Sequence, residues 1–191
     1  MLTKSQVKAI LDKMEVFQDG HFAVDGERHT AQAAYPMRVL QQPEYATSLA
    51  ATLGGAFRSL RPHAVLAFPG TGSLLALELA RALRARLVFA KRGPDGWRVS
   101  PGQALQADER VVLCDDVLTD ETEFLELANL VAACGAQVTG GAVMIDRSTL
   151  TFPWTIESLV RPDAPLLDPA ECELCKSGAP FTAARATVLS Q

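Results

Sequence analysis

Hydrophobic residues recur at helical spacing in the early part of the chain. Thr3 and Gln6 form a capping box ahead of one such run, which predicts a helix over residues 5–17. A second run predicts a helix over residues 43–60, which opens on a proline and is followed by another. Between them, residues 21–26 predict a short strand and a turn.

The middle of the chain alternates short apolar runs with helical segments. Residues 64–68 form a continuous apolar run bounded by prolines, which is typical of a strand buried on both faces. Further strands are predicted at 87–90, 111–114 and 138–145, with helices at 74–83 and 123–134. This alternation predicts an α/β fold on a parallel sheet. The proline-rich chain after Ser148 is expected to be irregular, with short apolar pieces such as 156–160.

Composition narrows the class of protein without identifying its chemistry. The chain has 191 residues, 48% of them hydrophobic, and a formal net charge of −4. This length predicts one domain, and the mild negative charge argues against a nucleic-acid-binding protein. There is no apolar run of about eighteen residues and no secretion signal, and the cysteines are too few for a disulfide scaffold. We therefore expect a cytoplasmic protein with neither membrane nor nucleic acid as a partner.

Two adjacent acids, Asp115 and Asp116, follow a predicted apolar strand. In open α/β sheets ligands bind outside the carboxyl ends of strands, where loops are expected here at 69–73, 91–108 and 115–122. Like charges so close together disfavour joint ionisation, and sugar hydroxyls or a metal ion would compensate them. The alternative is that both acids cap the following helix or face water.

Several segments, taken in order, carry a resemblance to a known family. They are Gly-His-Phe at 20–22, Arg-His-Thr at 28–30, Ala-Phe-Pro-Gly-Thr-Gly at 67–72, Ala-Lys-Arg at 90–92, the stretch 111–123, Ile-Asp-Arg-Ser at 145–148, and the cysteine-containing stretch 169–180. Over nearly its whole length the chain resembles the type I phosphoribosyltransferases, and among them the orotate phosphoribosyltransferase family with a short cysteine tail. The resemblance implies one domain over 1–191. Its core would be a mostly parallel central sheet flanked by helices (43–148), with a small hood and tail from 1–42 and 149–191.

The resemblance also implies a reaction. Orotate and phosphoribosyl diphosphate would give orotidine 5′-monophosphate and pyrophosphate, with Mg²⁺ carried mainly on diphosphate oxygens and no direct metal ligand assigned to the protein. Asp115 and Asp116 would hold the ribose hydroxyls, and Lys91 and Arg92 would close over the leaving group. The other implied residues bind the diphosphate substrate (Pro69, Gly70, Thr71, Gly72, Ser73, Thr119, Asp120, Glu121, Thr122, Glu123) or the base (Thr119, Arg147, Phe22). Relatives with this fold place loop residues across a dimer interface, so a homodimer is expected.

The segment 119–123 departs from the family pattern. Relatives carry Thr-Thr-Gly-Gly-Ser or a similar run there, whereas this chain reads Thr-Asp-Glu-Thr-Glu. At about 5 Å and an effective dielectric near 20, a carboxylate repels a phosphate charge by roughly 3 kcal/mol, more than a helix N-terminus returns. Acids in a first helical turn are also ordinary partners of the helix dipole. Two alternatives stay open: a catalytically impaired paralogue that senses a ligand or binds a partner, and a phosphoribosyltransferase of changed substrate.

A Cys-x-x-Cys pair, Cys172 and Cys175, lies near the C-terminus. A structural zinc ion needs four ligands, and no second pair follows; His21, His29 and His63 are distant along the chain. We interpret the pair as structural thiols or a local disulfide, with half of a metal site as the alternative.

Overall fold

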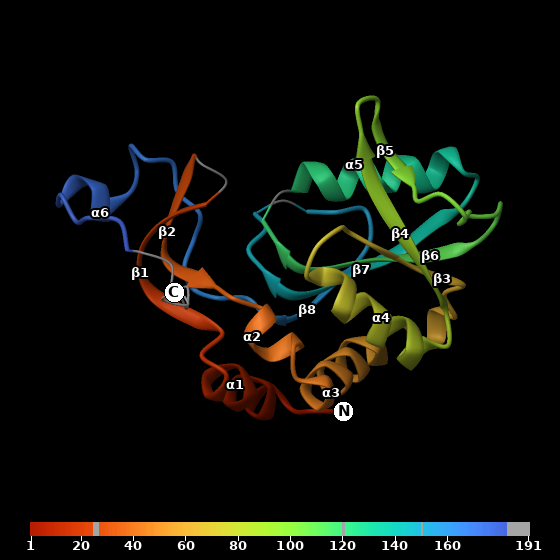
Figure 1. Ribbon diagram of the computed structural model, residues 1–191, viewed down its shortest axis with the longest axis horizontal. Coiled ribbons are helices and arrows are strands. Elements are labelled where there is room, and N and C mark those ends of the chain that lie inside the picture. The colour runs from red at the N-terminus through yellow and green to blue at the C-terminus, as the bar shows by residue number, and fades with distance from the viewer. Residues whose placement is uncertain (25–26, 120, 150, 183–191) are drawn as a thin grey trace, which may run out of the picture. The chain divides into compact units, whose positions relative to one another are not determined.

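The chain folds into two compact units. The computed structural model describes residues 1–24, 27–119, 121–149 and 151–182. The larger unit comprises residues 1–16 and 36–162, and the smaller unit comprises residues 17–35 and 163–191. Figure 1 labels the elements of both.

A six-stranded sheet forms the centre of the larger unit, in the order β5-β4-β3-β6-β7-β8. Its strands are β3 (Ala64–Ala67), β4 (Arg86–Gly93), β5 (Gly96–Val99), β6 (Arg110–Leu118), β7 (Gln137–Asp146) and β8 (Ile156–Val160). The neighbouring strands β4, β3, β6, β7 and β8 pair in parallel, while β5 pairs antiparallel with β4. The expected α/β fold with a mostly parallel sheet is confirmed.

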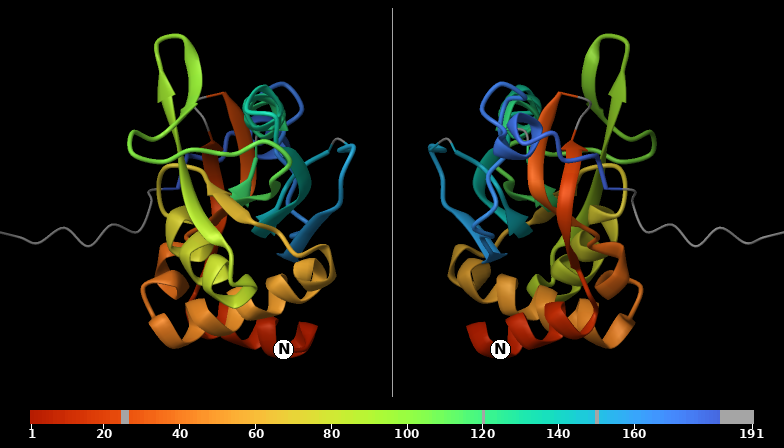
Figure 2. Two further views of the ribbon diagram at one scale, coloured as in Figure 1. Left: turned by 90° about the vertical axis from the view of Figure 1, so that its right-hand side faces the viewer. Right: turned by 90° about the vertical axis from the view of Figure 1, so that its left-hand side faces the viewer.

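Helices cover both faces of this sheet, as Figures 1 and 2 show. The helices of the larger unit are α1 (Lys4–Lys13), α2 (Met37–Leu40), α3 (Pro43–Gly54), the 3₁₀ helix η1 (Gly55–Leu60), α4 (Gly72–Leu83) and α5 (Glu121–Ala133). Helices α3 and α4 pack against each other on one face of the sheet, and α5 covers the opposite face. The capping box predicted at Thr3 and Gln6 is present at the start of α1.

The apolar core lies on both faces of the sheet because its central strands are buried on both sides. Every residue of β3 is buried. Beneath α5, Phe124 and Leu127 pack on the sheet, and the ring of Phe124 stacks on that of Phe68 with centroids 4.6 Å apart. On the other face, Leu75 and Leu79 of α4 are fully buried. This packing holds the strand ends, and the loops that leave them, in fixed positions.

Strand β6 is longer than the apolar pattern 111–114 predicts. Its ladder with β7 continues from Asp115 opposite Val143 to Leu118 opposite Asp146. The prediction of a loop from residue 115 is therefore wrong, because backbone pairing with a neighbouring strand outweighs the low strand propensity of aspartate. Both acids therefore lie within β6, near its carboxyl end.

The segment 91–108 was predicted as a loop, but its first part belongs to a β-hairpin: residues 91–93 end β4, and residues 96–99 form β5. Strands β4 and β5 meet at a tight turn, where Gly96 has φ +106°, a conformation open to glycine. The apolar piece 156–160, expected in an irregular tail, is strand β8 at the edge of the sheet. In both cases backbone pairing with another strand supplies the order, which the apolar pattern of the segment itself does not report.

The first two predicted helices end earlier than expected. Helix α1 ends at Lys13, because Glu15 adopts a left-handed backbone with φ +48° and Phe17 already begins a strand. Helix α3 ends at Gly54, and η1 continues the run as a 3₁₀ helix.

The smaller unit consists of a hairpin and the C-terminal segment that lies against it. Strands β1 (Phe17–Val24) and β2 (Arg28–Ala34) pair antiparallel, and the short helix α6 (Glu173–Lys176) lies in the C-terminal segment. His29 and Leu167 exchange two backbone hydrogen bonds, of 2.7 and 2.8 Å, and the Thr182 amide donates to the His21 carbonyl at 2.7 Å. The hairpin and the C-terminal segment are therefore joined at two points of the backbone.

Candidate active site

The carboxyl ends of the parallel strands bring several of the sequence-predicted site residues to one end of the sheet. Ala67, the last residue of β3, lies opposite Cys114 of β6, so the segment 69–72 leaves β3 beside the stretch of β6 that holds Asp115 and Asp116. Leu118 of β6 lies opposite Asp146 of β7, which places the segment 146–148 next in the row. This end of the sheet is where ligands bind in open α/β folds.

Asp115 and Asp116 contact the loop that follows β3. The Thr71 hydroxyl donates a hydrogen bond to Oδ2 of Asp116, which is buried. Asp116 also accepts at Oδ1 from the amide of Val117, at 3.0 Å, and Asp115 Oδ1 accepts from the amide of Asp116, at 2.8 Å. The acid pair and the β3–α4 loop therefore form one hydrogen-bonded group.

Gly72 makes this close approach possible. A Cβ atom at this position would lie 2.1 Å from Oδ1 of Asp115 and 2.8 Å from the backbone nitrogen of Asp116. Those separations are far inside van der Waals contact, so only glycine fits at the first position of α4. The turn before it uses Gly70 at φ +115°, and the Ser73 hydroxyl donates to the Gly70 carbonyl at 2.6 Å.

The acid pair is electrostatically unfavourable without a ligand. Burial, followed by the charge of Asp116, raises the pKa of Asp115 to about 8, and Glu123 contributes in the same direction. A group that brings positive charge or donates hydrogen bonds would favour the ionised form. The site is thus suited to a polyhydroxyl or cation-bearing ligand.

Glu123 and Glu126 of α5 bind the β4–β5 hairpin. The Arg92 guanidinium donates to Glu123 Oε1 at 2.7 Å and lies 3.7 Å from Glu126 Oε2, while the indole nitrogen of Trp97 donates to the same Glu126 atom at 2.9 Å. The guanidinium also lies over the Trp97 ring, 5.5 Å from its centroid. Neither the Arg92–Glu123 pair nor Trp97's role was predicted, because the residues are distant in sequence. Lys91, beside Arg92, is exposed.

Glu121 and Glu123 both lie in the first turn of α5, the position in which acids favour the helix dipole. Glu121 Oε1 accepts hydrogen bonds from the Thr149 amide, at 2.6 Å, and from its hydroxyl, at 3.3 Å. Thr119 precedes this turn and Thr122 is exposed within it, whereas Asp120 lies outside the described residues. The described acids of the departing segment are therefore engaged with neighbouring segments of the protein.

A second charged group lies at the carboxyl end of β7. Asp146 is buried and accepts at Oδ1 from the amide and hydroxyl of Ser148, at 2.8 and 2.6 Å. Arg161, just beyond β8, donates to Asp146 Oδ2. Arg161 was missed by sequence reasoning, because only the pairing of β8 with β7 brings it here. Arg147, which lies between Asp146 and Ser148 in the sequence, is half-buried, and burial lowers its pKa.

Comparisons with known proteins identify the family of the chain. The chain is 30% identical over 182 residues to an orotate phosphoribosyltransferase of Caldanaerobacter subterraneus subsp. tengcongensis, covering 94% of this chain and 96% of that one. It is also 30% identical over 176 residues to one of Thermotoga maritima, with 91% and 94% covered. The chain belongs to the orotate phosphoribosyltransferase family.

Solved structures confirm the fold of this phosphoribosyltransferase. An orotate phosphoribosyltransferase from Aeropyrum pernix superposes with a TM-score of 0.67 at 22% identity, covering 81% of this chain and 93% of that one. An adenine phosphoribosyltransferase from Leishmania tarentolae gives 0.64 at 19% identity, covering 90% and 94%. A scan against protein-family models gives no match. Within the described ranges, no helix combines the length and apolar character that a membrane span requires.

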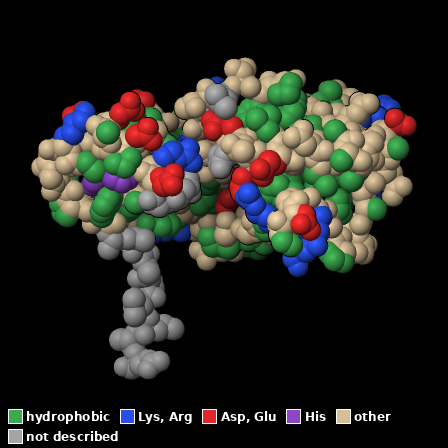
Figure 3. Space-filling view, turned by 90° about the horizontal axis from the view of Figure 1, so that it is seen from above, with side chains coloured by type: hydrophobic (Ala, Val, Ile, Leu, Met, Phe, Trp, Pro, Cys, Tyr) green, Lys and Arg blue, Asp and Glu red, His purple; other side chains and the backbone are tan. Residues whose placement is uncertain are grey.

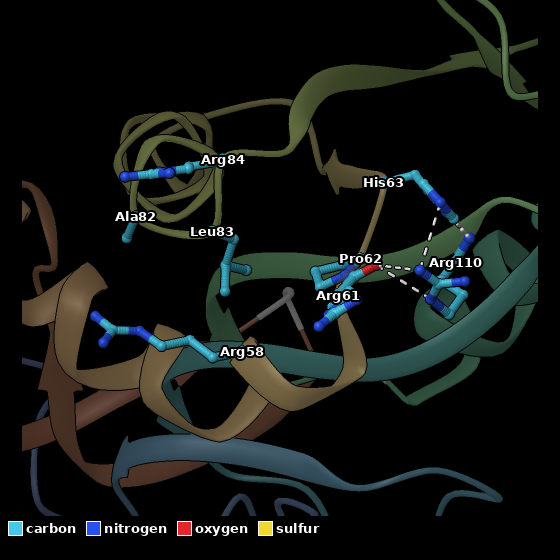
Figure 4. Close-up of a pocket in the computed structure, with 8 residues that line it drawn as sticks. All are labelled: Arg58, Arg61, Pro62, His63, Ala82, Leu83, Arg84 and Arg110. Atoms are coloured by element: carbon cyan, nitrogen blue, oxygen red, sulfur yellow. Dashed lines mark hydrogen bonds between the residues drawn. The ribbon is translucent and has the colours of Figure 1, made fainter.

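A basic pocket lies at the opposite end of the phosphoribosyltransferase sheet, where β3, β4 and β6 begin. It has a volume of about 680 Å³, and its lining includes Arg58, Arg61, His63, Arg84 and Arg110. Figure 4 shows the Arg110 side chain turned toward Arg61 and His63; its guanidinium donates to the Arg61 carbonyl at 2.7 Å. Because none of the family-matched residues lines this pocket, we assign the candidate active site to the carboxyl end of the sheet.

Phe22, implied in base binding, lies in β1 of the smaller unit and is buried there. Its expected role beside Thr119 and Arg147 stays a prediction.

Proposed function

We propose that this chain transfers the phosphoribosyl group of phosphoribosyl diphosphate to orotate. The observation that carries the proposal is the Asp115–Asp116 pair, packed against the Thr71–Gly72 turn at the carboxyl end of the sheet. It stands in a chain whose relatives over nearly the full length are orotate phosphoribosyltransferases.

In this reaction a ring nitrogen of orotate forms a bond to the anomeric carbon, and the bond from that carbon to the diphosphate oxygen breaks. The leaving pyrophosphate takes the electron pair, and the base nitrogen gives up its proton. Asp115 and Asp116 accept hydrogen bonds from the ribose hydroxyls and stabilise the positive charge that develops on the sugar. Substrate hydroxyls would also lower the raised pKa of Asp115, so that it becomes ionised as the sugar binds.

Magnesium suits this arrangement. Carboxylate oxygens and diphosphate oxygens are the hard ligands that Mg²⁺ prefers, and the raised pKa of Asp115 marks a site short of positive charge. When bound, the ion would neutralise the diphosphate charge. Asp115 and Asp116 are the residues that would face it, through water or through the sugar hydroxyls.

The Arg92–Glu123 pair gives the departing acidic segment a role that is compatible with catalysis. Arg92 offsets the charge of Glu123 in the structure. We propose that the diphosphate competes with Glu123 for this guanidinium, because a bidentate contact with a phosphate is stronger than an exposed ion pair. Closure of the β4–β5 hairpin would then accompany substrate binding.

The decisive experiment measures pyrophosphate release with orotate, phosphoribosyl diphosphate and Mg²⁺. We expect turnover that requires all three, and a loss of at least about 100-fold in kcat for Asp116→Asn, since a buried charge-stabilising group is removed. Asp12→Asn, a change at an exposed acid of α1, is the control and should retain activity. A folded protein that binds orotate or orotidine 5′-monophosphate but not the diphosphate would instead support the ligand-sensing alternative.

We also propose that the enzyme is a homodimer. The support is the family resemblance, in which the mobile loop at Lys91 and Arg92 reaches the partner subunit's site.

A further inference from the structure

Four potential metal ligands meet inside the smaller unit. They are His21 of β1, His29 of β2, and Cys172 and Cys175 beside and within α6; their ligand atoms all lie within 4.8 Å of one another. Three of the four side chains are buried, and Cys175 is half-buried. In Figure 3 the histidine colour appears in one small area of this unit, among hydrophobic side chains. The fold thus supplies the second pair of ligands that the sequence around the cysteines lacks.

The separations match the edges of a tetrahedral zinc site. Zn–N bonds of 2.0–2.1 Å and Zn–S bonds near 2.3 Å require about 3.3 Å between two nitrogens and about 3.6 Å between nitrogen and sulfur. Here His21 Nε2 lies 3.4 Å from His29 Nδ1 and 3.5 Å from each cysteine sulfur, and His29 Nδ1 lies 3.1 Å from the Cys175 sulfur. An ion at the centre of these atoms would need only small adjustments of the side chains.

The surroundings of His21 favour metal binding. Its Nδ1 lies 2.9 Å from the carbonyl oxygen of Ala179, to which a protonated Nδ1 donates. That hydrogen bond leaves Nε2 unprotonated and facing the cluster, the arrangement usual for a zinc-bound histidine. The Phe181 ring lies against both imidazoles, with centroids 4.3 Å from His21 and 5.0 Å from His29. It covers the cluster with an apolar surface.

The small core of this unit gives the metal a structural purpose. Its buried residues within the described ranges are His21, Phe22, His29, Thr30, Ala164 and Cys172. Half of them belong to the cluster, and few apolar side chains remain to hold the hairpin to the C-terminal segment. A two-stranded hairpin is marginal alone, and small proteins with little apolar core commonly add a metal or a disulfide.

We propose that His21, His29, Cys172 and Cys175 bind one structural Zn²⁺, which fastens the C-terminal segment to the β1–β2 hairpin. Both thiols would bind as thiolates and release their protons to solvent. Two thiolates, two neutral imidazoles and Zn²⁺ sum to zero charge, so the filled site can be buried without an unpaired charge. The tetrahedral S₂N₂ donor set is typical of zinc.

The first test measures the metal content of the full chain. Protein purified without a chelator or a histidine tag, then incubated with Zn²⁺ and desalted, should hold about one zinc per chain by mass spectrometry of the metal. The Cys172→Ser/Cys175→Ser double variant should hold less than about a tenth of that amount. Cys134→Ser, at a half-buried thiol outside the cluster, and His63→Gln, at an exposed histidine, are matched controls and should keep the full zinc content. A wild-type zinc content equal to that of the double variant would overturn the proposal.

The second test does not depend on how well a variant folds. Replacing zinc by Co²⁺ in the wild-type chain should give the intense visible bands of a tetrahedral cobalt site and a thiolate-to-cobalt charge-transfer band. Weak bands typical of octahedral cobalt would overturn the proposal, as would a Cys172–Cys175 disulfide found by intact mass in freshly purified protein. Removing the metal with a chelator under reducing conditions should speed proteolysis of the C-terminal segment, and Zn²⁺ should restore protection. Equal cleavage in both states would contradict a structural role.

Discussion

At the scale of single residues, the candidate site depends on one close contact and one unfavourable charge. The Asp115 carboxyl occupies the space that a side chain at position 72 would fill. The same carboxyl is buried next to Asp116, which raises its pKa. The close contact requires glycine at position 72, and the buried charge favours a ligand that stabilises the ionised carboxylate.

The raised pKa of Asp115 predicts a stability that falls as pH increases. The folded chain keeps this proton up to about pH 8, whereas the unfolded chain releases it near the ordinary value of 3.8. Between these values the folded state binds more protons, so the free energy of unfolding declines with pH, by at most about 1.4 kcal/mol per pH unit. Asp115→Asn should flatten this slope in urea titrations, and Asp95→Asn should leave it unchanged. Equal slopes in wild type and Asp115→Asn would contradict the assignment.

Gly72→Ala should damage both stability and substrate binding. The new methyl group would overlap Asp115 Oδ1, and overpacking of this kind typically costs about 1–3 kcal/mol. Gly54→Ala is the matched control, because its Cβ would meet its nearest neighbour, Leu79, at 3.4 Å, an ordinary contact. In the last turn of α3 that change should be neutral or stabilising by up to about 1 kcal/mol. Thermal unfolding and titration with phosphoribosyl diphosphate measure both variants; similar losses in the two would refute the steric argument.

At the scale of elements, the β4–β5 hairpin is joined to α5 partly by an ion pair between exposed side chains, Arg92 and Glu123. The Arg92 and Glu123 side chains are 56% and 38% exposed, so their ion pair contributes no more than about 1 kcal/mol. An ion pair this weak can be exchanged for a contact between Arg92 and a ligand.

Glu123→Gln therefore should affect binding more than folding. We expect a loss in the free energy of unfolding below about 1 kcal/mol. The Kd for phosphoribosyl diphosphate should fall by about 3-fold or more, because a repelling charge is removed and Arg92 is released. Isothermal titration calorimetry measures the affinity. Asp12→Asn, which removes one exposed acid from α1, is the charge-matched control. Weaker binding by Glu123→Gln would show instead that the carboxylate supports the substrate.

At the scale of the whole molecule, the two units have different sources of stability. The larger unit is built on a sheet buried on both faces, with helices on each side. The smaller unit has few buried apolar side chains, and a cluster of histidines and cysteines occupies its interior. Loss of the C-terminal segment should therefore affect the smaller unit first.

The proposed homodimer predicts complementation between inactive subunits. If Lys91 of one subunit serves the site that contains Asp116 of the other, mixing Lys91→Ala with Asp116→Asn after subunit exchange should restore about a quarter of wild-type activity. Sedimentation analysis of the wild type should show a dimer at the assay concentration. A monomer, or a mixture that stays inactive although exchange is demonstrated, would contradict the shared site.

The sequence by itself determined the fold class, the paired acids and the family. The period of apolar residues reports which faces of strands and helices are buried, and so alternating runs were enough to predict a parallel sheet. The adjacent acids of Asp115–Asp116 and the 67–72 turn were visible because their residues are contiguous.

Only the tertiary structure decided which distant side chains meet. The pairing of β8 with β7 brings Arg161 to Asp146, and the β4–β5 hairpin brings Arg92 to Glu123. The backbone bridge at Leu167 holds the C-terminal segment against β2, where Cys172 and Cys175 meet the two histidines. Local patterning carries no record of such contacts, because strand register and chain crossing are fixed by packing between segments far apart in the sequence.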